Sequence, residues 1–188
     1  MSDLPTPKFL DERVAHWAAT KPDEEAITYL SRTWTWSQWY DRVRRAAGAL
    51  SARGIKRGDA VAFLDKNHPA CAEVVLAAAS LGAATAIINF RLAADEMDYV
   101  LNDSGAKILF AGAELKPGVQ EIRDALPGVS EIIEVKPEGD DEYEAMLAAA
   151  TPVGRAPDVE TDDVCIIMYS SGTTGRPKGV ALTQANVI

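Results

Sequence analysis

The residues best suited to bind a ligand or take part in a reaction lie in one run near the end of the chain, Tyr169 to Val180. The run reads Y-S-S-G-T-T-G-R-P-K-G-V and combines hydroxyl side chains, glycines and a lysine. Glycine permits backbone conformations in which N–H groups turn toward a ligand. Hydroxyl groups add short hydrogen-bond donors, and the ammonium group of Lys178 adds a point charge suited to phosphate. This combination predicts a cradle for a polyphosphate.

The position of the run separates a ligand loop from a flexible Ser/Gly-rich linker, which composition alone would favour. An apolar segment rich in β-branched residues precedes it at 164–169, and this pattern is typical of a buried strand. A second short strand candidate follows at 179–183, and a helix start at 184–188. Open α/β sheets bind ligands on loops that follow their strands. We therefore expect a ligand loop at the end of a strand.

The spacing excludes two common nucleotide loops. In the Walker-type loop, G-x-x-x-x-G-K-[ST], the lysine follows a glycine, whereas here Pro177 precedes Lys178 and Gly179 follows it. The spacing of the dinucleotide pattern, G-x-G-x-x-G, does not fit either. In its order, the run is similar to the phosphate-loop signature of the adenylate-forming superfamily. That superfamily contains acyl-CoA synthetases, the adenylation domains of peptide synthetases and beetle luciferases.

Weaker resemblances to this superfamily extend over nearly the whole chain. They include an aromatic strand end at 35–39 and a G-D-x-V-A strand start at 58–62. The runs 89–92 and 102–107 look most like bacterial fatty-acyl-CoA synthetases. The resemblance implies that residues 1–188 form part of the N-terminal domain of such an enzyme. Residues 151–162 would then be a connector, and 164–188 a strand, the phosphate loop and the following strand.

The resemblance also implies a two-step reaction. A carboxylic acid, most simply a fatty acid, reacts with ATP and Mg²⁺ to give acyl-adenylate and pyrophosphate, and the acyl group then passes to CoA. Lys178 would be the catalytic residue, because its charge stabilises the departing pyrophosphate. Thr173 would reach Mg²⁺ through its side-chain oxygen. The residues implied to bind the nucleotide are Ser170, Ser171, Gly172, Thr173, Thr174, Gly175 and Lys178. Arg176 occupies a variable position of the signature, and we expect it to face solvent.

Two alternatives stay open. An acyl-AMP ligase would deliver the acyl group to a carrier protein instead of CoA, and a non-catalytic nucleotide-binding or interaction domain would keep only the fold. The motifs that the superfamily uses for adenine, ribose and a further Mg²⁺ ligand, and its C-terminal lysine, lie downstream of such a loop. Because residues 1–188 do not contain them, we expect this chain to look like a fragment that is inactive alone.

Two positions depart from the superfamily pattern. Proline is frequent where Ile87 stands, so this strand keeps a backbone N–H that proline would lack. A histidine usually follows the strand after the loop, where this chain has Gln184. Glutamine can replace a histidine that packs near the acyl pocket or forms hydrogen bonds in its neutral state. It cannot replace one that must be protonated.

Alternating helix and strand patterns predict the scaffold that positions the loop. A helix at 10–20 precedes a hairpin whose strands, 26–30 and 33–36, flank Ser31 and Arg32. Ser37 is expected to cap the next helix, and Gly54 to end it. Further strands are expected at 60–64, 84–88, 107–111 and 130–135, and helices at 69–81, 93–101, 116–126 and 143–150. Strands separated by helices predict an α/β fold with a doubly wound, mostly parallel sheet and flanking helices.

Three tryptophans, Trp34, Trp36 and Trp39, could in principle stack on a nucleotide base. Their spacing across a strand and the following helix favours core packing instead. The acidic run 140–142 lacks the glycine-spaced pattern of a calcium loop, so we assign it no metal. These residues therefore belong to the scaffold, and the run at 169–180 is the one strong site signal in the sequence.

Composition limits the partners. The chain has 188 residues, a net charge of −9 and no block of basic residues, which argues against nucleic acid. Cys71 and Cys165 lie in apolar surroundings and are expected to be buried free thiols in a reducing compartment. The apolar stretch around 74–79 is interrupted by Ser80 and Gly82, so no membrane span is expected, and the N-terminus lacks a signal peptide. We expect a cytoplasmic protein whose partners are ATP, a carboxylic acid and CoA, with oligomer formation left open.

Overall fold

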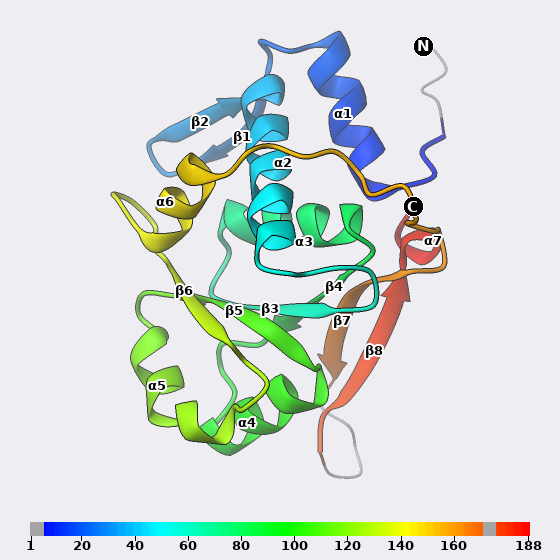
Figure 1. The fold of residues 1–188 in the computed structure, drawn as a ribbon. Helices are drawn as coiled ribbons and strands as arrows, with labels where there is room; N and C mark the ends of the chain where they lie inside the picture. Colours follow the sequence, from blue (N-terminus) through cyan, green and yellow to red (C-terminus); the bar gives the residue numbers. More distant parts are fainter. Residues whose placement is uncertain (1–5, 171–175) are drawn as a thin grey trace.

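A computed structural model describes residues 6–170 and 176–188 and contains a six-stranded sheet between two layers of helices (Figure 1). The strand order is β6-β5-β3-β4-β7-β8, and every neighbouring pair is parallel except β7 and β8. The strands are β3 (Ala60–Leu64), β4 (Ala84–Ile88), β5 (Ala106–Gly112), β6 (Glu131–Val135), β7 (Val164–Ser170) and β8 (Lys178–Thr183). The prediction of a doubly wound, mostly parallel sheet is confirmed.

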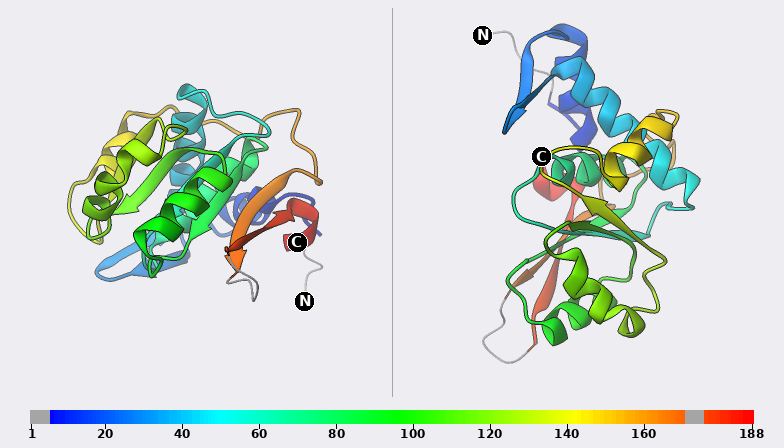
Figure 2. Two further views of the ribbon diagram at one scale, coloured as in Figure 1. Left: turned by 90° about the horizontal axis from the view of Figure 1, so that it is seen from below. Right: turned by 90° about the vertical axis from the view of Figure 1, so that its left-hand side faces the viewer.

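The two faces of the sheet carry separate hydrophobic cores. On one face, α2 (Trp36–Ala52), α3 (Pro69–Ser80) and α6 (Glu142–Ala149) cover Phe63 and Phe110. On the other, α4 (Ala94–Asp103) and α5 (Lys116–Glu121) cover Leu64 and Leu109. Figure 2 shows both layers from two further directions. Side chains that alternate along each buried strand supply both cores, which explains why the central strand β3 is apolar throughout.

A second, two-stranded sheet lies at the N-terminal side of the chain. It consists of β1 (Glu25–Tyr29) and β2 (Arg32–Thr35), and it packs with α1 (Leu10–Thr20) against α2. The turn lies at residues 30–31, one position before the predicted Ser31–Arg32, because Leu30 adopts the positive φ of 51°. Trp39 is buried there with Val14 and Val43, and Trp34 and Trp36 pack around them, so the predicted packing role of the tryptophans is confirmed.

The predicted cap of α2 is wrong. Thr35 caps this helix, because its side chain accepts a hydrogen bond from the Gln38 backbone N, and the Gln38 side chain accepts one from the Thr35 N. This reciprocal pair is a capping box, and it satisfies two backbone donors at once. Ser37 lies inside the first turn instead. Gly54 follows the helix with a φ of 81°, as predicted for its end.

Two other predictions differ from the structure, namely the extent of the helix at 116–126 and the burial of the strand at 164–169. The helix expected at 116–126 divides into α5 and a short 3₁₀ turn, Arg123–Ala125. Pro127 follows Leu126, and a residue before proline avoids the helical conformation, so the last turn tightens. Strand β7 is buried on one side only: Cys165 is inaccessible, whereas Met168 is 50% exposed. Its neighbour across the hairpin, Val180, is 48% exposed, so the described residues leave this end of the sheet face uncovered.

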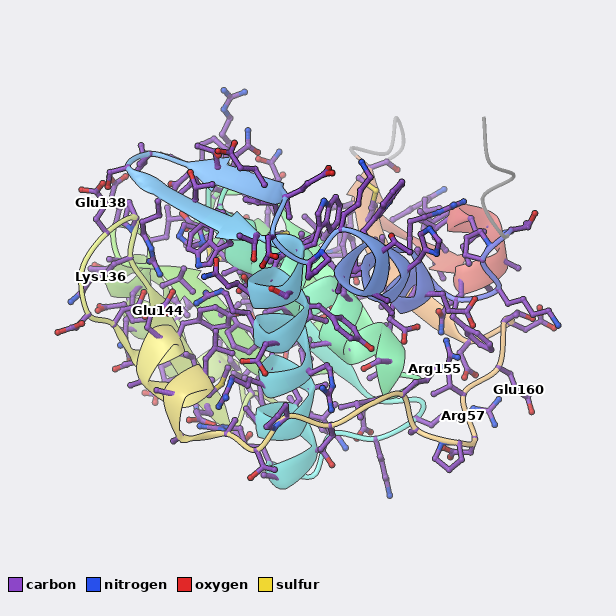
Figure 3. All side chains as sticks on the ribbon, turned by 90° about the horizontal axis from the view of Figure 1, so that it is seen from above. Arg57, Lys136, Glu138, Glu144, Arg155 and Glu160 are labelled. Carbon is purple, nitrogen blue, oxygen red and sulfur yellow. The ribbon has the colours of Figure 1, made fainter. Side chains whose placement is uncertain are left out.

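The connector between α6 and β7 follows the surface of α2 and α3. The backbone N of Val153 donates to Arg44 O, and that of Ala156 donates to Ser80 O. Gly48 of α2 faces the Thr151 carbonyl so closely that a side chain there would collide with it. Arg155 pairs with Asp11 at 2.8 Å and thereby ties the connector to α1 (Figure 3). The connector thus joins the N-terminal layer to the strand that leads into the loop.

In the described part of the chain, every helix is too short or too polar to cross a membrane. Cys165 is buried and Cys71 partly buried, and both are free thiols. Burial raises the pKa of Cys71 to about 11, so its thiol stays protonated at neutral pH. The expectation of buried free thiols is confirmed for Cys165 and holds partly for Cys71.

Candidate functional site

The candidate phosphate loop connects two antiparallel strands. Ser170 and Lys178 form the last cross-strand pair of the β7–β8 hairpin, and the loop joins them. Strand β7 runs parallel to β4, so the loop follows its carboxyl end, which is where open α/β sheets bind ligands. The predicted site residues Ser171, Gly172, Thr173, Thr174 and Gly175 lie outside the described residues. Their roles, including that of Thr173 toward Mg²⁺, stay predictions.

Ser170 and Lys178 lie opposite each other at the base of the loop. Directly paired residues of antiparallel strands point to the same face, so the hydroxyl and ammonium groups project on one side of the hairpin. Both residues are exposed. Among the described residues, no carboxylate lies within 4.0 Å of the Lys178 ammonium group. The pair therefore offers a hydrogen-bond donor and an uncompensated positive charge to an anionic ligand.

Tyr169 and Gly179, the next pair, point to the opposite face of the hairpin. A Cβ atom at Gly179 would lie 3.2 Å from the Tyr169 ring, so glycine allows the ring to lie across β8. The Tyr169 hydroxyl donates a hydrogen bond of 2.8 Å to an Asp103 carboxylate oxygen on α4. Burial, together with this bond, raises the pKa of Tyr169, so the hydroxyl stays protonated. Sequence analysis missed this contact, since no local pattern links positions 103 and 169.

Arg176 lies on the outgoing side of the loop and is exposed, as predicted. The structure adds one contact, because its guanidinium group lies 5.0 Å from the centre of the Tyr99 ring on α4. This distance is typical of a cation–π interaction. Arg176 therefore contacts the protein as well as the solvent.

Gln184 lies at the end of β8 remote from the loop. Its side chain is only 1% exposed and makes two hydrogen bonds of 3.2 Å. The amide oxygen accepts from the Leu10 N at the start of α1, and the amide nitrogen donates to the Ala79 carbonyl near the end of α3. The Leu10 N lies in the first turn of α1 and has no acceptor within that helix, whereas the Ala79 carbonyl also accepts from the Gly82 N at 3.0 Å. These contacts match a side chain that forms hydrogen bonds in its neutral state, and they do not require a protonated group at this position.

A Gln184→Leu substitution should lower the free energy of unfolding by about 1–3 kcal/mol, because it removes the acceptor of the Leu10 N–H and places an apolar side chain against the Ala79 carbonyl. Urea denaturation of the 188-residue chain measures this. Gln120→Leu, on the exposed side of α5, is the matched control and should change stability by about 0.5 kcal/mol or less. Equal losses in the two variants would mean that the Gln184 hydrogen bonds contribute nothing.

A cavity of about 500 Å³ lies between the N-terminal hairpin, the carboxyl ends of β3 and β4, and the start of α3. Its lining includes Phe63 from β3, Ile87 from β4 and Tyr29 from the hairpin. His68 borders it and caps α3, because its Nδ1 accepts from the Ala70 N at 3.0 Å. Burial lowers the pKa of His68 and keeps it neutral, so this ring is a helix cap at neutral pH.

The acidic run 140–142 has a structural role as well. Asp141 caps α6 by accepting from the Glu144 N, and its other oxygen accepts from the Lys136 N. In the described ranges, no group of three or more His, Cys, Asp or Glu residues is arranged to hold a metal ion. Figure 3 shows Lys136 and Glu144 on either side of this turn.

Comparison with known proteins gives a consistent set of relatives. A family model described as "AMP-binding enzyme" matches residues 14–188. A feruloyl-CoA synthase from Amycolatopsis sp is 36% identical over 170 residues, which cover 90% of this chain and 32% of that protein. A fatty acyl CoA synthetase from Mycobacterium tuberculosis superposes with a TM-score of 0.83 and 34% identity, covering 94% of this chain and 35% of that one.

A further solved structure extends the set. The anthranilate CoA ligase AuaEII, in complex with anthranoyl-AMP, superposes with a TM-score of 0.87 and 26% identity, covering 97% of this chain and 36% of that one. The chain spans about a third of the length of the curated relatives that it matches. What these proteins share with it includes the sheet and the β7–β8 segment, because the matches cover nearly the whole chain.

Proposed function

This chain belongs to the family of AMP-binding enzymes, which includes acyl- and aryl-CoA ligases, and from this premise we propose that it supplies the phosphate-binding half of an ATP site. The observation that carries the proposal is the β7–β8 hairpin, which holds Ser170 and Lys178 side by side at the base of the loop. A hydroxyl and an ammonium group without a nearby carboxylate suit a triphosphate chain.

In the proposed reaction, a carboxylate oxygen attacks the α-phosphorus of ATP, and the bond to pyrophosphate breaks. Lys178 and Ser170 stabilise the negative charge that gathers on the departing pyrophosphate, so their interactions strengthen as the reaction proceeds. The thiol of CoA then attacks the acyl carbonyl carbon, and AMP leaves. Mg²⁺ would neutralise phosphate charge, with Thr173 as its proposed protein ligand.

We propose a carboxylic acid with an apolar body as the substrate, and a fatty acid as the first candidate. The names of the relatives cover both fatty and aromatic acids, namely fatty acyl, feruloyl and anthranilate. A panel of hexanoate, palmitate, ferulate and anthranilate therefore separates the two classes. A preference for the aromatic acids would replace the fatty-acid proposal and leave the reaction unchanged.

Acid-dependent exchange of labelled pyrophosphate into ATP tests the proposal. The assay should use a longer polypeptide that carries residues 1–188 followed by a segment corresponding to the part of the relatives that this chain does not cover. We expect exchange with at least one acid of the panel and acyl-CoA formation when CoA is added. We expect neither reaction from the 188-residue chain alone. Exchange by that chain would contradict the proposal that it supplies only half of the ATP site.

The other outcomes distinguish the alternatives. Exchange followed by transfer to a phosphopantetheinyl carrier protein, without transfer to CoA, would identify an acyl-AMP ligase. Binding of Mg·ATP in equilibrium dialysis, without exchange for any acid, would identify a non-catalytic nucleotide-binding domain. Loss of both binding and exchange would contradict the proposed ATP site.

A further inference from the structure

We propose that helix α4 is the platform on which the phosphate loop is held, with Asp103 and Tyr99 as its positioning residues. The two residues are four positions apart in α4, so they lie on one face of the helix. Asp103 contacts Tyr169, directly before the loop, and Tyr99 contacts Arg176, directly after it. One helix face therefore holds both arms of the loop. The consequence for ATP chemistry rests on the proposed function, whereas the contacts themselves do not.

The incoming arm is fixed more firmly. The Tyr169 ring packs against the hydrophobic core under α4, and its hydroxyl donates to the Asp103 carboxylate at 2.8 Å. A hydrogen bond to an ionised acceptor is stronger than one between neutral groups. Gly179 leaves room for the ring, so the last glycine of the signature serves this packing. The end of β7 is thereby tied to α4 one residue before Ser170.

The outgoing arm is separated from α4 by a cavity. Between this arm and the helix lies a cavity of about 590 Å³, whose lining includes Asp95, Glu96, Asp98, Asn102 and Pro177. The guanidinium group of Arg176 over the Tyr99 ring spans this gap. The Arg176–Tyr99 contact therefore joins this arm to the helix across the cavity.

The platform lies on the back of the hairpin. Residues alternate between the two faces of a strand, so Tyr169 and Gly179 face α4, whereas Ser170 and Lys178 face away from it. The helix face is acidic, with Asp95, Glu96 and Asp98 beside the arm. These carboxylates repel a polyphosphate and leave the face with Lys178 as its binding side. The same geometry orders both arms before the nucleotide arrives, which reduces the entropy lost on binding.

Hydrogen exchange of the 188-residue chain, followed by mass spectrometry, tests the platform without any ligand. Tyr169→Phe removes only the hydroxyl group, and Asp103→Ala removes its acceptor. Each should speed exchange of the amides at 178–183 by roughly tenfold, the effect of losing a charge-assisted hydrogen bond, and leave 60–64 in β3 unchanged. The double variant should exchange no faster than either single variant, because the two groups form one bond.

Tyr40→Phe is the matched control. It removes the hydroxyl of a tyrosine on α2 that lies away from the loop, and it should leave exchange at 178–183 unchanged. A urea midpoint for each variant identifies general loss of folding, which would speed exchange in β3 as well. Unchanged exchange at 178–183 in folded Tyr169→Phe and Asp103→Ala variants would overturn the platform.

The longer ligase polypeptide provides the functional readout. There, Tyr169→Phe should raise the KM for ATP about five- to tenfold while the rate of acyl transfer from preformed acyl-adenylate to CoA stays unchanged, because only nucleotide binding uses the ordered loop. Faster hydrogen exchange without any acid-dependent activity would leave the platform standing and contradict the proposed function. Normal activity with unchanged KM and unchanged hydrogen exchange would overturn the platform alone.

Discussion

Replacing Lys178 with alanine should lower acid-dependent ATP–pyrophosphate exchange about 100- to 1,000-fold in the longer polypeptide on which the proposed function is tested. The physical reason is the position of the side chain. Lys178 begins β8, lies opposite Ser170, and has no carboxylate of the described residues within ion-pair distance to neutralise it. Its charge is therefore available to the pyrophosphate that would leave in the first step of the proposed reaction.

The loss should fall mainly on kcat, because charge on the leaving group grows toward the transition state. Lys178→Arg should restore only part of the rate, since a planar guanidinium group does not reproduce the compact ammonium charge. Exchange at saturating ATP separates a defect in kcat from a defect in binding.

Lys56→Ala is the control for this experiment. It removes another exposed lysine, which lies in the turn before β3, at the edge of the sheet opposite the loop, and it should leave exchange unchanged. Wild-type exchange by Lys178→Ala would show that the loop does not act on the leaving group. Equal losses in Lys56→Ala and Lys178→Ala would point to a general charge effect instead of a site.

The centre of the scaffold was predictable because its strands, β3 and β4, are made almost entirely of apolar residues. The predicted bounds of β3, 60–64, and of β4, 84–88, agree with the structure, since central parallel strands are buried on both faces and are bordered by turn residues. The sequence also contains the pattern of the α2 capping box, because Thr35 precedes Gln38 by three positions, although Ser37 is the cap that we predict. The resemblance to adenylate-forming enzymes is confirmed by the family match over residues 14–188.

Contacts between distant segments were not predictable. Residues 103 and 169 meet because β4 and β7 are neighbours while α4 follows β4, and strand order does not appear in a local pattern. Gln184 similarly bonds to Leu10 and Ala79, far away in the sequence. The exposure of Met168 depends on what covers the sheet, and an apolar strand looks buried in either case. Periodicity therefore predicts elements, whereas the partners of single polar groups require the folded chain.

The largest loss of stability is expected at a buried ion pair that holds three helices together. Glu73 of α3 has a fully buried side chain, and Arg42 of α2 donates to both of its oxygens, at 2.6 and 3.1 Å. The Tyr143 hydroxyl of α6 donates to Glu73 at 2.8 Å, and Arg42 also bonds to Glu144. Figure 3 shows Glu144 on α6 at the side of α2. Burial raises the pKa of Tyr143, so its hydroxyl stays a donor.

Arg42→Met should lower the free energy of unfolding by about 3–5 kcal/mol, because it keeps much of the side-chain volume and leaves the Glu73 carboxylate buried without its cation. Urea denaturation of the 188-residue chain measures the loss. Arg53→Met, which breaks the exposed pair with Glu131, is the matched control and should cost about 1 kcal/mol or less.

A double variant separates the possible causes of this loss. If the isolated carboxylate is responsible, Arg42→Met combined with Glu73→Leu should regain part of the lost stability, because it removes the unpaired buried charge and leaves only the Tyr143 hydroxyl without its acceptor. If lost packing of the arginine stem is responsible, the double variant should be no more stable than Arg42→Met. Since α3 contacts β4 and β7, this ion pair lies in the helix layer that packs against the first strand of the hairpin.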